Sequence, residues 1–487
     1  MAVFGTAIEI GTDLAEGRYS SREIVEAYLA RMDGVGRSLN AVVARRDEAA
    51  LAQADAADEA RRAGRNLGPL AGVPVTIKES FDVAGLPTTF GHPDRAGHRA
   101  GTDSVAVSRL VAAGAIVMGK TNVPKDLADW QSFNAIYGAT RNPWDEGRTP
   151  GGSSGGAAAA MAAGLSALEF GSDIAGSIRV PAVYCGVWGH KPTFGIVPIR
   201  GHGMSEDAAP SDILVGGPLA RSAFDLELAL DLTAGADDGD VGAGAWGLSL
   251  PGEARDRLAE FRIGIIDSDR HFPVDGSIRL ALGELGDALV REGAVVDPSP
   301  VLPVGSLEHY ELFLMLLRGA TSARFSEDEI GELAKKARGF AADDASYDAI
   351  MHRALSQSHR SWLAADDKRH ALRRRWAAFF RRYDALICPV MTTTAFPSMI
   401  GVPKIEQFLM VDGARRPASD CYYWIGLPSL SYLPATAIPI GLSREGLPIG
   451  AQIIGPEFGD KRCIRLAQLI ERAFRSFVPP PKFAASP

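Results

Sequence analysis

The segment from Pro150 to Ala182 constrains this chain most, because two glycine-flanked serine turns lie on either side of an expected helix and strand. The first turn is GGSSGG at 151–156, and the second is IAGSI at 174–178. Glycine tolerates positive φ and lets a ligand approach the main chain closely. Successive amides in such turns form anion-binding hollows. The segment is therefore better suited to a reactive site than to packing alone.

The residues between the two turns predict a helix and a strand that bring the turns together. Gly155–Ala163 is almost entirely alanine, the strongest helix former, and Gly164 stands where a C-terminal glycine cap belongs. Leu165–Phe170 predicts a short buried strand, and Gly171 is expected to open the loop that carries Ser177. Serine turns also serve as N-caps and turn formers, so this pattern alone leaves a purely structural interpretation open.

Several segments together resemble the amidase signature family. Its pattern is a GGSSGG turn followed, after a fixed interval, by G-[ST]-D-x-[GA]-G-S-[IV]-R-x-P. This chain has GGSSGG at 151–156 and GSDIAGSIRVP at 171–181. The resemblance extends to GVPVTIKESFDVAG (72–85), GKTNVPKDLAD (119–129), CGVWGHKPTFGIVP (185–198) and GLPIGAQIIGP (446–456). It covers roughly residues 20–230 and 385–475 and leaves the middle of the chain unmatched.

The resemblance implies a catalytic set made of a lysine, a serine that follows a cis peptide and a nucleophilic serine. Carried onto this sequence, these residues are Lys78, Ser153 and Ser177, and the interval from Ser153 to Ser177 equals the family's spacing. The tetrahedral oxyanion is expected to lie against the main-chain amides of Ile174, Ala175, Gly176 and Ser177. Ala175 departs from the glycine that is commoner at its position, but it keeps the amide.

The chemistry of a serine nucleophile agrees with this assignment. A serine hydroxyl needs a base within hydrogen-bond reach. His190 and His202 are the nearest histidines in sequence, but no carboxylate signature accompanies either, so each is expected to be structural. Lys78 can act as the base if burial lowers its pKa from about 10.4 to near neutrality. Ser153 would then relay the proton of Ser177 to Lys78, and the reverse transfer would protonate the departing amine.

Other residues are expected to support the site or to bind substrate. Asp173 and Arg179 are predicted to hold the second turn, and Ser154 is either a helix N-cap or a second hydroxyl beside the relay. By its position in the family pattern, Leu127 is expected to line the acyl pocket. Further candidates for substrate contact are Trp130, Gln131, Tyr422, Tyr423 and Trp424, which are compatible with an aryl or medium-sized hydrophobic acyl group.

Two other motif matches point to different chemistry and are outweighed by their context. GGSSG fits the G-x-S-x-G nucleophile elbow, which requires a preceding strand, whereas the preceding NPWDEGRTP is loop-like. GAIVMGKT at 114–121 fits the phosphate-binding P-loop pattern. Its middle residues are apolar and predict a buried strand instead.

Strand-like runs alternate with helical segments along the chain, which predicts an α/β fold with a large mixed, mostly buried sheet and helices on both faces. The runs are 73–77, 115–119, 262–267, 385–390, 436–440 and 449–454. Ser20 and Glu23 predict a capping box that opens a helix to about Met32. The resemblance implies one amidase domain over 1–487. Residues 303–383 are expected to be a helical cap over the active site, with the cationic run Lys368–Arg382 on a solvated helix face.

Composition fits an ordinary soluble enzyme. The chain has 487 residues, of which 46% are hydrophobic, and a net charge of −8, which gives no general attraction to nucleic acid or anionic membranes. The four cysteines are far apart and lack metal-ligand spacing. The N-terminus does not fit a signal peptide, and no apolar run is long enough to span a membrane. We expect a cytoplasmic enzyme without metal or cofactor.

The residues and the resemblance together imply a serine hydrolase that cleaves the carbon–nitrogen bond of a small amide through a Ser177 acyl-enzyme. The products are ammonia or an amine and a carboxylic acid. Two alternatives stay open: the glutaminase subunit of a tRNA-dependent amidotransferase, and a carbamate or ester hydrolase with the same triad. A homodimer is the assembly expected of a free amidase, whereas a glutaminase subunit would join partner proteins.

Overall fold

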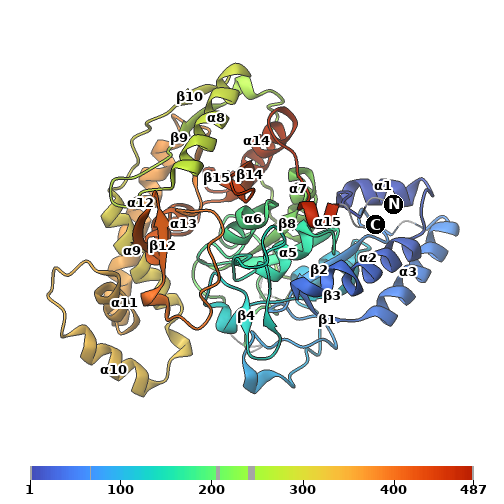
Figure 1. The fold of residues 1–487 in the computed structure, drawn as a ribbon, viewed down its shortest axis with the longest axis horizontal. Helices are drawn as coiled ribbons and strands as arrows, with labels where there is room; N and C mark the ends of the chain where they lie inside the picture. Colours follow the sequence, from blue (N-terminus) through green and yellow to red (C-terminus); the bar gives the residue numbers. More distant parts are fainter. Residues whose placement is uncertain (1–2, 66, 205–208, 240–246, 485–487) are drawn as a thin grey trace.

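One mixed β-sheet organises the molecule (Figure 1). The structure is a computed structural model that describes residues 3–65, 67–204, 209–239 and 247–484. Within these residues eleven strands pair in the order β1-β3-β2-β6-β8-β7-β14-β15-β11-β9-β10. Their bounds are β1 (Val42–Arg45), β2 (Pro74–Lys78), β3 (Ile116–Thr121), β6 (Leu168–Asp173), β7 (Trp188–Lys191), β8 (Val215–Ala220), β9 (Arg262–Ile265), β10 (Val295–Asp297), β11 (Ala385–Pro389), β14 (Ala435–Leu442) and β15 (Pro448–Ile454). The pairs β4 (Phe133–Asn134) with β5 (Gly138–Ala139) and β12 (Phe408–Val411) with β13 (Ala414–Pro417) form small separate ribbons.

The sheet is parallel in its β3-β2-β6 and β11-β9-β10 parts and antiparallel between them, where β8, β7, β14 and β15 lie. Every residue of β2, β6, β8 and β15 is buried. Because successive side chains of a strand point to opposite faces, this continuous burial means that both faces of the sheet are covered. The predicted α/β fold with a large, mostly buried mixed sheet is confirmed.

The helices outside residues 303–383 come from all other parts of the chain. Their bounds are α1 (Ala7–Ala15), α2 (Ser21–Asp33), α3 (Asp47–Arg62), α4 (Val105–Ala112), α5 (Gly155–Ala162), α6 (Arg179–Cys185), α7 (Ala223–Thr233), α8 (Gly276–Arg291), α13 (Cys421–Ser429), α14 (Asp460–Ala473) and α15 (Pro481–Ala484). The predicted capping box at α2 is present, since Ser20 Oγ accepts from the amide of Glu23 and the Glu23 carboxylate accepts from the amide of Ser20.

Residues 303–383 are helical, as their pattern predicts. They form α9 (Ser306–Ala320), α10 (Glu327–Ala337), α11 (Tyr347–Leu355) and α12 (His359–Phe379). Figure 1 shows α10 and α11 at one edge of the molecule, far from α1 to α3. The prediction that the whole cationic run of α12 is solvated is wrong for Arg369, which is 1% exposed. Asp212 and Asp366 neutralise its guanidinium, and it stacks on the ring of Tyr432.

The strand after α5 begins later than predicted. Leu165–Ala167 form the reversal after the helix, and β6 runs from Leu168 to Asp173. The strand continues past Gly171 because β8 pairs with it as far as Asp173, opposite Val215. The second serine turn consequently starts after Asp173. The P-loop-like segment contains the buried strand β3, as its apolar residues predict.

Candidate functional site

Lys78 lies at the centre of a buried polar cluster. It is the last residue of β2 and is fully buried. Its Nζ lies 2.6 Å from Ser153 Oγ and 2.9 Å from Ser172 Oγ. Burial lowers the pKa of Lys78 to about 7, although the negative charges of Asp173 and Glu169 act in the opposite direction. A neutral amine is therefore readily available near neutral pH.

Ser153 belongs to the first glycine turn, directly before α5. The peptide bond between Gly152 and Ser153 is cis, as the resemblance implies. The main chain is packed so closely here that a Cβ on Gly152 would lie 2.4 Å from the carbonyl oxygen of Asp129. Only glycine fits at that position. This turn therefore brings the hydroxyl of Ser153 to the amine of Lys78 within a fully packed interior.

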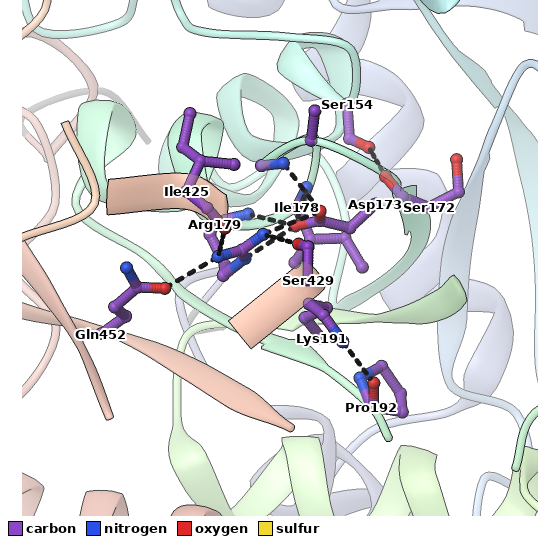
Figure 2. A network of polar contacts seen from close by, with 12 residues as sticks. Ser154, Ser172, Asp173, Ile178, Arg179, Lys191, Pro192, Ile425, Ser429 and Gln452 are labelled. Carbon is purple, nitrogen blue, oxygen red and sulfur yellow. Dashed lines mark hydrogen bonds and ion pairs between the residues drawn. The ribbon is translucent and has the colours of Figure 1, made fainter. Parts of the chain in front are cut away.

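The second turn is fixed by a buried ion pair between Asp173 and Arg179. The Asp173 carboxylate accepts from the amides of Gly176 (2.7 Å) and Ile178 (3.2 Å) and from Arg179 Nε (3.0 Å). Burial alone would raise the pKa of Asp173, but the Arg179 guanidinium and these donors hold it below its ordinary value. Figure 2 shows the guanidinium reaching onward to the carbonyl of Ile425 and to the side chains of Ser429 and Gln452.

Ser154 connects the first turn to the second turn and to β6. The amide of Ser154 donates to the carbonyl oxygen of Ser177 at 3.1 Å. Ser154 occupies the N-cap position of α5, but its hydroxyl makes no capping bond and donates instead to the carbonyl of Ser172 at 3.3 Å (Figure 2). Of the two interpretations offered for Ser154, the hydroxyl beside the polar cluster fits these contacts.

The amides of the second turn differ in whether they are already engaged. Gly176, whose φ is +86°, donates its amide to Asp173 and is not available to an oxyanion in this structure. The expectation that all four amides of 174–177 face the oxyanion is therefore corrected for Gly176. Within the described part of the chain, the amides of Ile174, Ala175 and Ser177 donate to no protein acceptor. These three remain as candidate oxyanion donors.

Ser177 lines a cavity of about 570 Å³. Ile174 and Ala175 line it beside the serine, and two predicted substrate-binding residues, Leu127 and Trp130, are in its wall. Gln131 is not in the wall, which corrects the expectation for this residue. Its Oε1 accepts from the amide of Met399 at 2.7 Å, and it faces a separate depression.

Of the three aromatic candidates at 422–424, one lines the cavity and two are packed in the core. Tyr422 lines the cavity. Tyr423 instead stacks on Phe272 with ring centroids 4.7 Å apart, and Trp424 Nε1 donates to the carbonyl of Phe272. Because these two side chains are engaged in the core, only Tyr422 of the three is placed to meet a ligand.

Sequence reasoning missed the hydrogen bonds of Ser172 and His202. His202 Nε2 lies 2.9 Å from Ser172 Oγ and 3.0 Å from Ser80 Oγ. Burial lowers the pKa of His202 to about 3, and the nearby charge of Lys78 adds to this, so the imidazole is neutral. Ser172 is recognisable in the motif GSDIAGSIR, but the contact with His202 joins distant segments and leaves no local signal.

His190 has a carboxylate partner that its sequence neighbourhood does not reveal. Its Nε2 lies 3.1 Å from Asp460 Oδ1, and its Nδ1 lies 2.9 Å from Thr436 Oγ1. Asp460 comes from the distant helix α14, so no local sequence signature reveals it, and the contacts agree with the structural role expected of His190. His190 does not line the cavity, and its contacts join β7 to β14 and α14.

The described residues hold neither a metal-binding cluster nor a membrane-spanning helix. They contain no group of three or more His, Cys, Asp or Glu side chains that could hold a metal ion. No helix in the described ranges is both long and apolar enough to cross a bilayer. All four cysteines are buried free thiols.

Comparisons with known proteins agree with this geometry. The sequence model of the Amidase family matches residues 23–464. The chain is 34% identical over 484 residues to a glutamyl-tRNA(Gln) amidotransferase subunit of Chloroflexus aurantiacus, covering 94% of each protein. It is 34% identical over 470 residues to a 1-carboxybiuret hydrolase subunit of Pseudomonas sp. (strain ADP), covering 95% of this chain and 97% of the relative. A solved bacterial aryl acylamidase of the amidase signature family superposes with a TM-score of 0.79 at 25% identity, over 99% of each chain.

Proposed function

Since the chain belongs to the amidase family, we propose that it hydrolyses the carbon–nitrogen bond of a small-molecule amide through an acyl-enzyme on Ser177. One observation carries the proposal: the Lys78 amine lies 2.6 Å from Ser153 Oγ, next to the turn that presents Ser177 to the cavity. A base, a relay hydroxyl and a nucleophile in one place are what amide cleavage by a serine requires.

In the proposed reaction, neutral Lys78 takes the proton of Ser153, and Ser153 takes the proton of Ser177 as its oxygen attacks the amide carbon. The carbonyl oxygen becomes an oxyanion against the amides of Ile174, Ala175 and Ser177. The proton then returns by the same path to the nitrogen, the carbon–nitrogen bond breaks, and ammonia or an amine departs. Water, deprotonated by the same relay, releases the carboxylic acid and restores Ser177.

Ser172 and His202 are proposed as positioning residues for the base. Because the His202 imidazole is neutral, its Nε2 can accept from Ser172, whose oxygen can then accept from Lys78. This arrangement would hold the amine toward Ser153. Asp173 and Arg179 would act on the second turn in the same indirect way, since neither lines the cavity.

Labelling with a fluorophosphonate followed by peptide mapping tests the assignment of the nucleophile. We expect the wild-type protein to be labelled on Ser177 and Ser177→Ala to remain unlabelled while it unfolds at the same temperature. Label on Ser153 or Ser154 would reject the proposal.

A second candidate function is supported by the names of the relatives. The amidotransferase relative and the 1-carboxybiuret hydrolase relative are each named as one subunit of an enzyme, so this chain would by analogy release ammonia or product within a complex. Amide hydrolysis by the purified chain, as a homodimer and without ATP or tRNA, would favour the free amidase. A panel of matched amides, carbamates and esters distinguishes the remaining alternative.

We further propose that residues 1–487 form one amidase domain in which α9 to α12 cap the active site. The support is local: Leu317, Arg318, Thr321 and Arg324, at and just after the end of α9, line the same cavity as Ser177. Selectivity for the substrate would then depend on this helical segment as well as on Leu127 and Trp130.

A further inference from the structure

One wall of the cavity carries cations that have no carboxylate partner. Arg318, Arg324 and Lys404 all line the cavity that contains Ser177. Within the described residues none of the three lies within ion-pair distance of an acidic side chain. Arg369 on α12 shows the contrast, because its guanidinium is neutralised by Asp212 and Asp366. Cations that face a cavity without such partners are able to bind an anionic ligand.

The contacts of the three cations leave donors unused. Arg318 Nη2 donates to the hydroxyls of Tyr347 and Tyr422, while its Nε is buried without a partner. Lys404 Nζ has one long bond, 3.3 Å, to the carbonyl of Ala128. Arg324 Nε donates to the carbonyl of Thr321. Each cation is thus held in place by neutral groups and retains N–H groups for another acceptor.

Trp130 joins this wall to the turn that carries the nucleophile. Its Nε1 donates to the carbonyl of Ala175 at 3.1 Å, and its ring lies 4.9 Å from that of Tyr422. Lys404 Nζ lies 4.4 Å from the centre of the Trp130 ring and 5.3 Å from that of Tyr422. The Trp130 indole thus lies between Lys404 and the reactive turn, and Arg318 lies 5.5 Å from the centre of the neighbouring Tyr422 ring.

Two acidic residues of the cavity reduce the positive charge of this wall. Asp126 and Asp129 also line it, and their charges act on Arg324 and Lys404 from beyond ion-pair distance. Among the described residues, the three cations Arg318, Arg324 and Lys404 outnumber these two carboxylates, so the wall keeps an excess of positive charge. The remaining pair in the cavity lining, Arg200 with Asp237, is self-neutralised at 2.6 Å.

We propose that this wall binds a carboxylate on the substrate, so that the enzyme prefers small amides that carry a carboxylate at the end remote from the amide bond. The inference rests on the proposed function, because it takes the amide carbon to lie at Ser177. A flat or extended apolar spacer would cover Trp130 and Tyr422, while the carboxylate would accept from the unused donors of Arg318, Arg324 and Lys404.

Calorimetric binding to the full-length Ser177→Ala protein tests the proposal, because this variant retains the cavity without turnover. The probes are two matched pairs: succinamate with neutral levulinamide, and para-carbamoylbenzoate with neutral para-acetylbenzamide. We expect each anionic amide to bind about tenfold or more tightly than its neutral match, as gained charge-assisted hydrogen bonds require. Adding Arg324→Met or Lys404→Met should reduce that preference, and adding both should reduce it further, to what Arg318 alone supports.

A matched control is Lys335→Met, which removes an exposed lysine of α10 that does not line the cavity. It should leave the preference unchanged. Equal binding of charged and neutral probes, absence of binding by both anionic amides, or an undiminished preference in the Arg324→Met, Lys404→Met protein would each overturn the proposal. Failure of the proposed function appears separately, as absence of fluorophosphonate label on Ser177 in the wild-type protein.

Discussion

The second glycine turn and the end of α9 line the same cavity, but the segments to which they belong are built in opposite ways. From Gly151 to Lys191 every residue except Ile174 is buried, and main-chain bonds together with the Asp173–Arg179 pair fix the reactive groups. By contrast, α10 has no buried residue. The cations at and just after the end of α9, Arg318 and Arg324, line the cavity through long side chains rather than through the main chain. Under the proposed function, the chemistry would belong to the rigid turns and selectivity would depend on the helical side.

The largest expected effect is on the base. Lys78→Ala should lower amide turnover by about 10⁴-fold, because the relay loses its proton acceptor, and should lower turnover of activated esters much less. Lys191 offers a matched control, since burial also lowers its pKa to about 7, but its Nζ donates only to the carbonyls of Pro192 and Leu433. Lys191→Met should reduce stability and leave turnover per folded molecule nearly unchanged. Equal losses in the two variants would contradict the distinction.

The next effect is on stability of the turns. Asp173→Asn leaves the fully buried Arg179 guanidinium without its counter-charge, so we expect the free energy of unfolding to fall by about 3 to 5 kcal/mol. Asp237→Asn removes a pair whose arginine, Arg200, is 54% exposed, and should cost less than about 1 kcal/mol. Urea unfolding of both variants measures the difference. Similar losses would mean that the turn is not held by the buried pair.

A smaller effect is expected from the hydroxyl beside the base. Ser172→Ala removes an acceptor of the Lys78 ammonium and should lower kcat on amides about tenfold. Because a hydrogen bond to the charged form favours that form, its loss should also move the pH midpoint of activity to lower values. Ser166→Ala, which removes a buried hydroxyl bonded to the carbonyl of Leu168, is the control and should leave the midpoint in place.

The smallest effects are expected at two residues that are neighbours in the sequence, Trp130 and Gln131. Trp130→Phe loses the bond to the carbonyl of Ala175 and should reduce kcat/KM by roughly threefold to tenfold. Gln131→Ala should change KM by less than about twofold, because Gln131 faces a separate depression. Steady-state kinetics on one amide measures both. A larger effect at Gln131 than at Trp130 would contradict the described cavity.

The sequence predicted the features that depend on local pattern. Continuous apolar runs identified β2, β3 and β15, and the alanine run identified α5. The spacing of glycine and serine predicted the turn whose Ser153 contacts Lys78. Local pattern failed where a partner comes from a distant segment: Asp460 beside His190, Asp212 beside Arg369, and His202 beside Ser172.

The failures within the motif itself have a different cause. Asp173 is predicted to hold the second turn, but residue type alone does not say which amide its carboxylate meets, so the motif does not predict the loss of Gly176 as an oxyanion donor. Likewise, the position of Gln131 next to Trp130 gave no indication that their side chains face different hollows. Arg318 and Arg324 lie in the middle of the chain that the resemblance leaves unmatched, and Lys404 lies in a matched range but outside its motifs, so no motif guided the interpretation of these cations.

The pH dependence of Ser177 labelling tests the central claim most directly, because it follows the state of the proposed base without a turnover step. The rate of fluorophosphonate labelling in the wild-type protein should rise with a midpoint near pH 7 as Lys78 loses its proton. Lys78→Arg should label slowly at every pH, since a guanidinium keeps its proton. Fast labelling of Lys78→Arg with the same rise would contradict the account, because Lys78 would then be only a structural cation.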